Sequence, residues 1–454
     1  MSAIARVLLE MGYRVSGSDV AAQESTEKLA AKGARVYIGH KAGHVRGADM
    51  VVYSAALPKD NVEIVAAERL NIPILHRAEM LARIMDVRRG IAVAGAHGKT
   101  TTSSMIALVM EESGLDPTYI IGGEIMNVGS NAKAGKGEYV VAEADESDGS
   151  FLNYHPEIAI VTNIEADHLE NYGGDFANLK KAYAAFLNQI KPGGMAVICL
   201  DDPHLKELMP SIKAKTITYG MGPEADFHAE DVMLGDRKSS FVLCRGAERL
   251  GRVELSIPGR HNVLNALAAI ITCLEAGVPL AEIIRSIKLF RGAKRRFQVL
   301  GEAGGILVID DYAHHPTEIE ATIAAARSTG KRIIAVFQPQ RYTRTYFLLE
   351  QFSRAFYGAD EVLITDIYSP AGEKRIEGVT SARLVELIRQ NSNPNVRLVP
   401  TKEEVLQELL NRVKPGDLVL TMGAGDIWKT AEALSGELKR KYEGEPGGLR
   451  EPAR

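Results

Sequence analysis

An α/β fold of three domains is predicted by the sequence, and three observations support it. The chain has 454 residues, which is more than one hydrophobic core accommodates. Short apolar runs alternate with helical segments, a pattern typical of parallel sheets flanked by helices. One apolar run, at residues 91–94, leads through a glycine-rich turn into a helical segment, as in sites that hold phosphate groups.

The first domain is expected at residues 1–88. Its predicted elements are helices at 2–11 and 25–32 and strands at 13–18, 35–38 and 50–54. Because strands and helices alternate, we expect one parallel sheet with helices on both faces.

Two further domains are expected at residues 89–292 and 293–441. The second should have strands at 91–94, 139–142 and 158–163, a β-rich insertion near 215–257 and a helix at 262–276. The third should have strands at 306–309, 332–337, 361–364 and 418–422. The tail at 442–454 is rich in glycine, proline and charge, which predicts disorder.

The overall composition excludes several classes of protein. Hydrophobic residues make up 46% and charged residues 25%, as in globular rather than disordered proteins. The formal net charge of −4 argues against a nucleic-acid partner, because phosphate binding normally requires a basic surface. No apolar run is long enough to span a membrane, and residues 1–20 lack a signal pattern. We therefore expect a cytoplasmic protein without membrane insertion, as a monomer or homodimer.

The cysteines provide no framework for the fold. There are three of them, an odd number, and none lies in a CxxC pair. A disulfide scaffold or structural zinc site is therefore not expected. Reduced, buried cysteines are the simplest interpretation.

The glycine-rich turn after residues 91–94 is the strongest single motif. It consists of Gly95, Ala96, His97, Gly98, Lys99, Thr100 and Thr101, followed by a helix expected to 110. Backbone N–H groups in such a turn point into one concavity, and the helix start adds positive potential. Lys99 would then reach the β- and γ-phosphates of a nucleotide, and the Thr100 hydroxyl would bind Mg²⁺. An ordinary strand–helix turn is the alternative, but GKTT directly after an apolar strand favours the phosphate site.

Two polar runs follow the next expected strands. Glu143, Asp145, Glu146 and Asp148 come directly after residues 139–142. Acids at the carboxyl end of a parallel strand, beside a phosphate loop, suit Mg²⁺, although a solvated acidic loop is the usual meaning of such a run. His168 follows the strand at 158–163 and could bind a second Mg²⁺ or position a reacting carboxylate, with a structural role equally open.

Several motifs, taken together, resemble the Mur ligases, and the resemblance covers nearly the whole chain. The central motifs are, in order, GAHGKTT, EADESDGSFL, TNIEADHLENY and PGRHNVLNALAA. The motifs of the last third are RRFQVLGE, DDYAHHPTE, QPQRYTRT and MGAGDIWK. DDYAHHPTE with QPQRYTRT is most similar to the alanine-adding members of the family.

This resemblance implies a fold and a reaction. The implied domains are a Rossmann-like N-terminal domain for a UDP-linked substrate, a P-loop-type ATPase domain and a Rossmann-like C-terminal domain for an amino acid. The implied reaction uses ATP and Mg²⁺ to join L-alanine to the carboxylate of UDP-N-acetylmuramate, in peptidoglycan synthesis.

The resemblance also implies roles for individual residues. Those implied at the nucleotide and metal are Lys99, Thr100, Glu143 and His168, with Asn262 and Asn265 at the adenine and Arg296 beside the phosphates. Those implied around the alanine and the muramoyl carboxylate are Tyr312, His314, Arg341 and Arg344. Each has a local alternative, such as Asn262 capping its helix or the arginines forming a solvated face.

The sequence departs from the family pattern at two places. The family begins with a strand and a glycine loop resembling GIGGxGM, and this sequence starts inside the helix that follows, at Met1. We therefore expect an opened first sheet and poor binding of the UDP substrate, with Ser18, Asp19 and Ser54 as the remaining candidates to contact it. Gln340 stands where the alanine-adding members commonly have histidine, which puts a proton-dependent role there in doubt. Lys180 and Lys181 lie near the position of a modified lysine in related ligases and receive no assignment.

Other readings remain open at this point. One is a murein-tripeptide ligase or another Mur-type amino-acid ligase, against which RYTRT argues. Another is a P-loop ATPase that drives a conformational change, against which the motifs of the last third argue. A third is a relative without catalytic activity.

Overall fold

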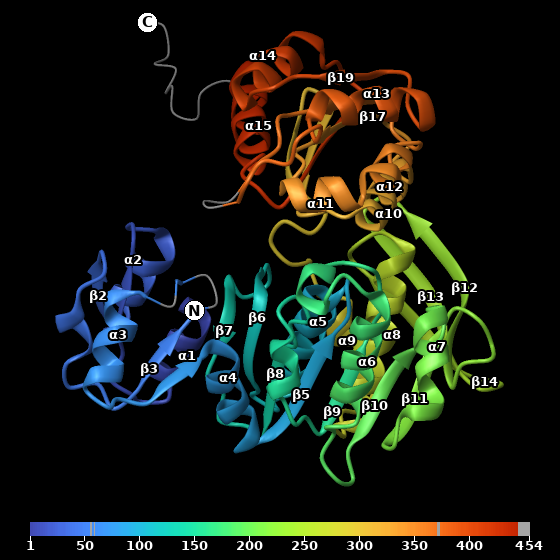
Figure 1. Ribbon diagram of the computed structural model, residues 1–454. Helices are drawn as coiled ribbons and strands as arrows, with labels where there is room; N and C mark the ends of the chain where they lie inside the picture. The colour runs from blue at the N-terminus through green and yellow to red at the C-terminus, as the bar shows by residue number, and fades with distance from the viewer. Residues whose placement is uncertain (55–56, 59, 370–372, 444–454) are drawn as a thin grey trace, which may run out of the picture. The chain divides into compact units, whose positions relative to one another are not determined.

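The computed structural model describes residues 1–54, 57–58, 60–369 and 373–443 (Figure 1). The chain divides into two compact units. The first comprises Met1–Val232, Ser240–Leu255 and Asn262–Arg291, and the second Met233–Ser239, Ser256–His261 and Gly292–Arg454. Each unit contains its own large sheet.

The N-terminal segment of the first unit contains two small parallel sheets. Strand β1 (Ser16–Asp19) pairs with β2 (Arg35–Ile38), and β3 (Val51–Tyr53) pairs with β4 (Ile74–His76). The single sheet expected from the sequence is therefore replaced, among the described residues, by two separate pairs of strands. The helices of this segment are α1 (Ser2–Glu10), α2 (Glu24–Ala31), η1 (Ala42–Val45), α3 (Val62–Arg69) and α4 (Arg77–Asp86).

Strand β1 begins three residues later than the sequence predicted. Gly12, with φ 92°, ends the preceding helix, and Tyr13 N donates to Leu8 O at 3.0 Å. These residues therefore complete the helix end and cannot join the strand.

A ten-stranded sheet forms the centre of the first unit. Its order is β14-β13-β12-β11-β10-β9-β5-β8-β6-β7. The bounds of its strands in chain order are β5 Arg89–Ala94, β6 Thr118–Ile125, β7 Ser130–Lys133, β8 Tyr139–Glu143, β9 Ile158–Val161, β10 Met195–Cys199, β11 Lys215–Gly220, β12 Phe227–Gly235, β13 Lys238–Arg245 and β14 Glu248–Leu255. β5 lies between β8 and β9 and is parallel to both, so the loops after these three strands meet at one edge.

Helices pack against this sheet, and the sequence predicted only some of them. They are α5 Lys99–Glu112, α6 Phe176–Leu187, α7 Pro203–Leu208, α8 Arg260–Glu275 and α9 Leu280–Ile287, with short helices η2 Ser150–Asn153, η3 Leu169–Tyr172 and η4 Met209–Ser211. Helix α5 starts at Lys99, two residues before the expected start, because Gly98 already caps it. The three cysteines are free and buried, as expected.

The second unit is built on a six-stranded sheet in the order β15-β16-β20-β17-β18-β19. Its strands are β15 Gln298–Ala303, β16 Ile306–Asp311, β17 Arg332–Phe337, β18 Glu361–Ile364, β19 Val396–Leu398 and β20 Asp417–Met422. β15 is antiparallel to β16, and the other neighbours are parallel. Alternate residues of β16 enter two separate cores, Leu307 and Ile309 on one face and Ile306 and Val308 on the other.

Helices cover both faces of this second sheet. They are α10 Pro316–Arg327, α11 Tyr342–Phe347, α12 Leu349–Arg354, α13 Ser381–Asn391, α14 Lys402–Arg412 and α15 Trp428–Glu443. Helix α15 extends two residues into the segment expected to be a disordered tail, and residues 444–454 of that segment lie outside the described residues. Among the described helices, none combines the length and apolar character needed to cross a membrane.

Candidate active site

The glycine-rich loop at residues 95–98 connects β5 directly to α5. Gly95 has φ 132° and Gly98 has φ 84°, backbone conformations that residues with a side chain rarely adopt. A Cβ at Gly95 would lie 2.1 Å from Thr162 Oγ1, and a Cβ at Gly98 would lie 2.4 Å from Asn265 Oδ1. Both positions therefore require glycine, and neighbouring side chains fix the shape of the loop.

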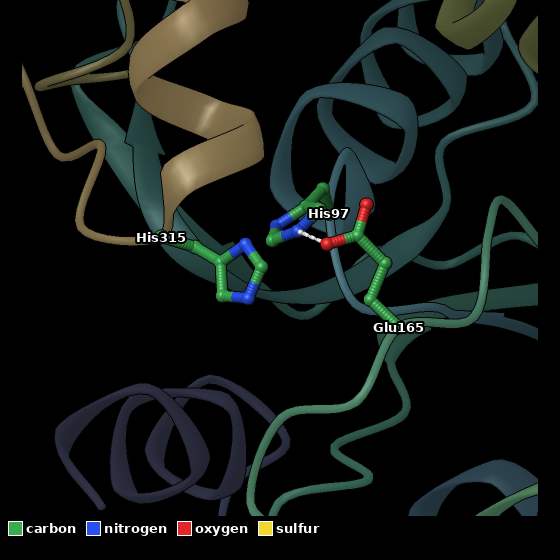
Figure 2. A group of neighbouring side chains, drawn as sticks. All are labelled: His97, Glu165 and His315. Carbon is green, nitrogen blue, oxygen red and sulfur yellow. Dashed lines mark hydrogen bonds and ion pairs between the residues drawn. The ribbon is translucent and has the colours of Figure 1, made fainter. Parts of the chain in front are cut away.

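Asn163, two residues after the end of β9, anchors the same loop. Its side-chain amide donates to His97 O at 3.0 Å and accepts from His97 N at 2.8 Å. The His97 ring then contacts Glu165, with Nε2 and Oε2 3.1 Å apart (Figure 2). Asn163 is not among the residues predicted from the sequence, although the polar run after the strand is a usable signal for it.

Lys99, the first residue of α5, is held by a carboxylate. Its Nζ lies 2.8 and 2.9 Å from the two oxygens of Glu146 and also donates to Gly95 O and, at 3.3 Å, to Ala96 O. Burial lowers the pKa of Lys99, but the surrounding carboxylates outweigh burial and raise it. Burial raises the pKa of Glu146 in spite of the attraction of Lys99. A phosphate group that binds at the loop must therefore take the ammonium from Glu146.

Glu143, the last residue of β8, is fixed by backbone and hydroxyl groups. Its Oε1 accepts from Gly122 N at 2.7 Å and from Ser103 Oγ at 3.4 Å. Ser103 lies one turn after Thr100 on α5, so Thr100 and Glu143 border the same space. A hydroxyl and a carboxylate beside a phosphate loop are ligands that fit a hard cation such as Mg²⁺.

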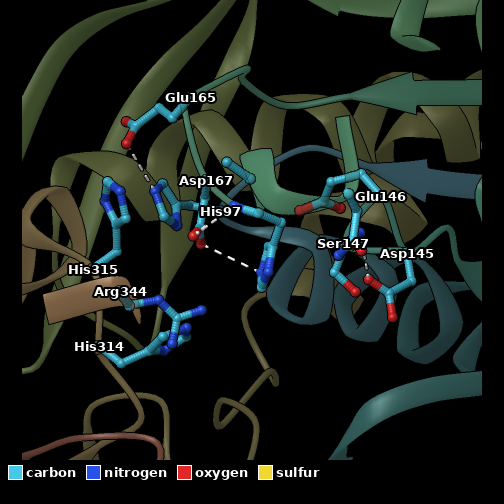
Figure 3. Close-up of polar contacts among 12 residues, drawn as sticks. His97, Asp145, Glu146, Ser147, Glu165, Asp167, His314, His315 and Arg344 are labelled. Atoms are coloured by element: carbon cyan, nitrogen blue, oxygen red, sulfur yellow. Dashed lines mark hydrogen bonds and ion pairs between the residues drawn. The ribbon is translucent and has the colours of Figure 1, made fainter. Parts of the chain in front are cut away.

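Asp145 and Glu146 follow Glu143 in the loop after β8 (Figure 3). Asp145 Oδ1 accepts from Ser147 N at 3.0 Å. Burial raises the pKa of Asp145, but this hydrogen bond together with Lys99 and Arg77 outweighs burial and lowers it to about 2. The carboxyl group of Asp145 is therefore ionised at neutral pH.

His168 lies in the loop after β9, at the edge that also carries the glycine-rich loop and Glu143. Its φ is 55°, and its Nε2 lies 3.4 Å from Asp167 Oδ2 and its Nδ1 3.8 Å from Glu170 Oε1. The structure brings His168 and Glu143 to the same edge, with β5 between their strands. The carboxylates of Asp167 and Glu170 therefore lie beside His168, an arrangement that the position of His168 in the sequence does not reveal.

Asn262 and Asn265 lie one turn apart on α8 and are both buried. Asn265 Nδ2 donates to Asn262 Oδ1 at 3.1 Å, and Asn265 Oδ1 accepts from Thr102 Oγ1 at 3.3 Å. Asn265 therefore contacts both the start of α5 and, through Gly98, the phosphate loop.

The loops after β16 and β17 of the second unit carry Tyr312, His314, Arg341 and Arg344, and Arg296 lies just before β15. The Arg295 and Arg296 guanidinium carbons lie 5.1 and 5.3 Å from the centre of the Tyr312 ring. Arg296 Nη1 also donates to Glu318 Oε1 at 3.3 Å. His314 Nδ1 lies 2.9 Å from Tyr312 O, and His314 N donates to Glu318 Oε2 at 2.9 Å.

Asp311, at the end of β16, is a buried carboxyl next to these arginines. Its oxygens accept from Phe297 N at 2.6 Å and Ala313 N at 2.7 Å. Burial raises its pKa to about 6. Its neighbour Asp310 instead accepts from Arg295 Nε at 2.8 Å. The sequence shows the pair Asp310–Asp311 but does not show this difference between the two carboxyl groups.

Arg341 and Arg344 follow β17 at the start of α11. Arg341 has φ 69° and is exposed, whereas Arg344 is buried and donates to Gln340 Oε1 at 3.1 Å. Gln340 therefore keeps a hydrogen-bonding role at the position where a histidine was expected.

The candidates for the UDP-linked substrate lie at the carboxyl ends of β1 and β3. Ser18 Oγ donates to Glu63 Oε2 at 2.6 Å and lies 2.9 Å from His40 Nδ1. Asp19 accepts from Ala21 N at 3.4 Å. Ser54 directly follows β3.

Comparison with family models covers most of the chain in three consecutive parts. The matches are to the Mur ligase family catalytic domain at residues 1–89, the Mur ligase middle domain at 93–273 and the Mur ligase glutamate ligase domain at 295–425.

Individual relatives match over nearly their whole length. The UDP-N-acetylmuramate–L-alanine ligase of Symbiobacterium thermophilum is 48% identical, covering 97% of this chain and 93% of the relative. The ligase of the same name from Pelotomaculum thermopropionicum is 49% identical, covering 98% and 96%.

A solved structure agrees with these matches. UDP-N-acetylmuramate-alanine ligase from Thermotoga maritima is 28% identical, with a TM-score of 0.81 and coverage of 97% of each chain. With the phosphate loop, the acidic loop and the arginine-bearing loops in place, the chain belongs to the Mur ligase family of ATP-dependent ligases.

Proposed function

We propose that this chain joins L-alanine to the carboxylate of UDP-N-acetylmuramate, using ATP, in peptidoglycan precursor synthesis. The observation that carries this proposal is the phosphate loop, with Lys99 and Glu143 at one sheet edge, in a chain that matches alanine-adding ligases along nearly all its length. A carboxylate does not react with an amine at neutral pH unless it is first activated. Phosphorylation by ATP supplies that activation.

The chemistry proceeds in two steps. The muramoyl carboxylate attacks the γ-phosphorus of ATP, which gives an acyl phosphate and ADP. The neutral amine of alanine then attacks the acyl carbon, and the tetrahedral adduct expels phosphate and loses a proton to give the amide. Most of the catalysis comes from positioning and from neutralising the negative charge of the reactants.

The first unit supplies the groups that hold ATP. Lys99 moves from Glu146 to the phosphates, and backbone N–H groups at the start of α5 donate to them. Thr100, Glu143 and His168 offer ligand atoms for Mg²⁺, which would neutralise phosphate charge when bound. Asn262 and Asn265 hold the adenine with polar side chains presented from α8.

The second unit supplies the groups for alanine and for the carboxylate that reacts. Arg341 and Arg344 provide planar donors that match a carboxylate. Tyr312 and His314 border that site, and Arg296 is the cation assigned to the transferred phosphate. Residues 1–88 take the UDP-linked substrate, residues 89–292 ATP and residues 293–441 the amino acid. We place this reaction in the cytoplasm.

The test is phosphate release from ATP measured with each substrate omitted in turn. The proposal requires release that depends on UDP-N-acetylmuramate and rises on addition of L-alanine. Hydroxylamine added without alanine should trap the acyl phosphate as a hydroxamate of the muramoyl group. Equal release without the UDP-linked substrate would contradict a ligase and favour an ATPase.

A further inference from the structure

Arg77 lies between the β3–β4 edge and the acidic loop after β8. It was not among the site residues predicted from the sequence. It is the first residue of α4 and directly follows β4. The parallel register pairs Tyr53 of β3 with His76 of β4, so Ser54 and Arg77 both follow the carboxyl ends of adjacent strands. Arg77 therefore begins at the edge assigned to the UDP-linked substrate.

The side chain of Arg77 reaches the acidic loop of the large sheet. Its Nη2 donates to Asp145 Oδ2 at 2.7 Å and to Asp148 Oδ2 at 3.3 Å. The three side chains are buried to a similar extent, with 26–34% of their surface exposed. One guanidinium thus joins two carboxylates that flank Glu146 in the sequence.

Glu146 is the residue that holds Lys99, so three contacts lead from Arg77 to Gly95 of the phosphate loop. The path runs from Arg77 to the loop at 145–148, then from Glu146 to Lys99 at 2.8 Å, and from Lys99 to Gly95 O. Helix α4 packs against β3 and β4 as well as β5 and η2, so it connects the β3–β4 edge to the large sheet. Figure 1 shows α4 beside that sheet. A shift at the β3–β4 edge would therefore move the acidic loop through a short, charged connection.

We propose that Arg77 is a positioning residue that couples occupation of the β3–β4 edge to release of Lys99 from Glu146. When the UDP-linked substrate binds beside Ser54, the start of α4 shifts, and Arg77 moves the bound Asp145 and Asp148 with it, which releases Lys99 from Glu146 for ATP. This inference rests on the proposed assignment of the two substrates to the two edges. Coupling of this kind is reciprocal, so each substrate tightens binding of the other.

The experiment measures the affinity of a non-hydrolysable ATP analogue by calorimetry, with and without saturating UDP-N-acetylmuramate. In the unaltered protein the ratio of the two dissociation constants should be about tenfold, within the usual range of such couplings. Arg77→Ala should bring the ratio close to one, with a smaller change in affinity for the analogue alone. Arg77→Lys, which keeps the charge but loses the planar fork, should keep part of the ratio.

The control is Arg83→Ala, an exposed arginine on the same helix, which should leave the ratio unchanged. If Arg77→Ala does not fold, Asp148→Asn removes the charge of one partner of Arg77 without altering the helix and should lower the ratio partway. A full ratio in Arg77→Ala, or no coupling in the unaltered protein, would overturn the inference. Failure of the unaltered protein to bind the analogue at all would instead refute the proposed function.

Discussion

Two strand edges gather charged side chains in this chain, and the balance of charge differs between them. The phosphate-loop edge, after β5, β8 and β9, carries Lys99, Glu143, Asp145, Glu146, Asp148, Glu165 and Asp167. The arginine edge, after β16 and β17 and including the residues that contact them, carries Arg295, Arg296, Arg341, Arg344, Asp310, Asp311 and Glu318. Acids predominate at the first and arginines at the second.

One carboxyl group at each edge has a shifted pKa, and the two shifts have opposite signs. Asp145 is ionised down to low pH, with a pKa of about 2, because a backbone N–H and two cations outweigh its burial. Asp311 has a pKa of about 6, because burial dominates although Arg296 lies nearby. The two pKa values thus follow from local burial and contacts. Separately, the excess of acids at the first edge favours added cations when a polyphosphate binds, whereas the arginines of the second edge suit a carboxylate.

The largest expected effect is loss of turnover in Lys99→Ala. Without the ammonium, charge that develops on the transferred phosphate is unbalanced, and we expect a loss of about a thousandfold in kcat, as for other electrostatic donors. Phosphate release with all substrates present is the measurement.

Loss of folding would mimic this result, because Glu146 would be left buried without its partner. Lys99→Ala combined with Glu146→Gln removes that charge and should recover thermal stability without recovering turnover. Near-normal phosphate release in either variant would remove Lys99 from the mechanism and would break the comparison between the edges.

The second effect is an opposite pH dependence of stability at the two edges. Asp311 binds its proton more tightly in the folded state than in the unfolded state, since its pKa rises from 3.8 to about 6. Folding is therefore favoured at low pH by this group, and that stability is lost as pH rises from about 4 to about 6, by about 3 kcal/mol in total.

Asp311→Asn should abolish this slope in the free energy of unfolding, measured by chemical denaturation at several pH values and compared with the unaltered protein. Asp145 has the opposite sign, because its pKa falls from 3.8 to about 2, so its stabilisation is lost only as pH falls through that range. The same slope in Asp311→Asn as in the unaltered protein would show that Asp311 is ionised in the fold at its ordinary pKa.

The third effect is a raised Mg²⁺ requirement in Glu143→Ala. The acidic edge is expected to need Mg²⁺, and Glu143 is the carboxylate held beside the start of α5. We expect the Mg²⁺ concentration for half-maximal turnover to rise by about thirtyfold, as for loss of a positioned group at a metal site.

The matched control is Glu112→Ala, an exposed acid at the far end of α5. It should leave the Mg²⁺ titration unchanged. An unchanged titration in Glu143→Ala would assign Glu143 a structural role at Gly122, and Glu146 would then be tested.

Much of the phosphate-loop edge could be predicted because its signals are local. The turn at Gly95–Thr101 can be predicted from an apolar strand, two glycines and the start of a helix. Partners from elsewhere in the chain could not be predicted in this way. Glu146 holds Lys99 from another loop, and Arg77 reaches Asp145 from 68 residues away. Such pairs depend on tertiary packing, which short-range patterns do not contain.

The N-terminal segment and the arginine edge were harder to predict for different reasons. The strand expected at 13–18 was wrong at its start, because the end of a helix competed for the same residues. At the arginine edge the sequence shows the arginines but not their burial. Arg344 is buried on α11, whereas Arg341 is exposed at the same helix start, a difference of one helical turn that only packing decides.

The smallest expected effect is a selective rise in the KM for alanine in Arg344→Lys. Arg344 is buried and already donates to Gln340, so a lysine would keep the charge but lose the planar fork that pairs with a carboxylate. We expect the KM for alanine to rise by about tenfold, roughly one lost charged hydrogen bond, with the KM for ATP nearly unchanged. Arg354→Lys is the control, because Arg354 is exposed on α12 and paired with Glu350. Initial rates at varied alanine and varied ATP separate the two constants. A tenfold rise in both would mean that Arg344 supports the fold of the second unit and does not bind alanine, and the arginine edge would then lose its assignment as the carboxylate site.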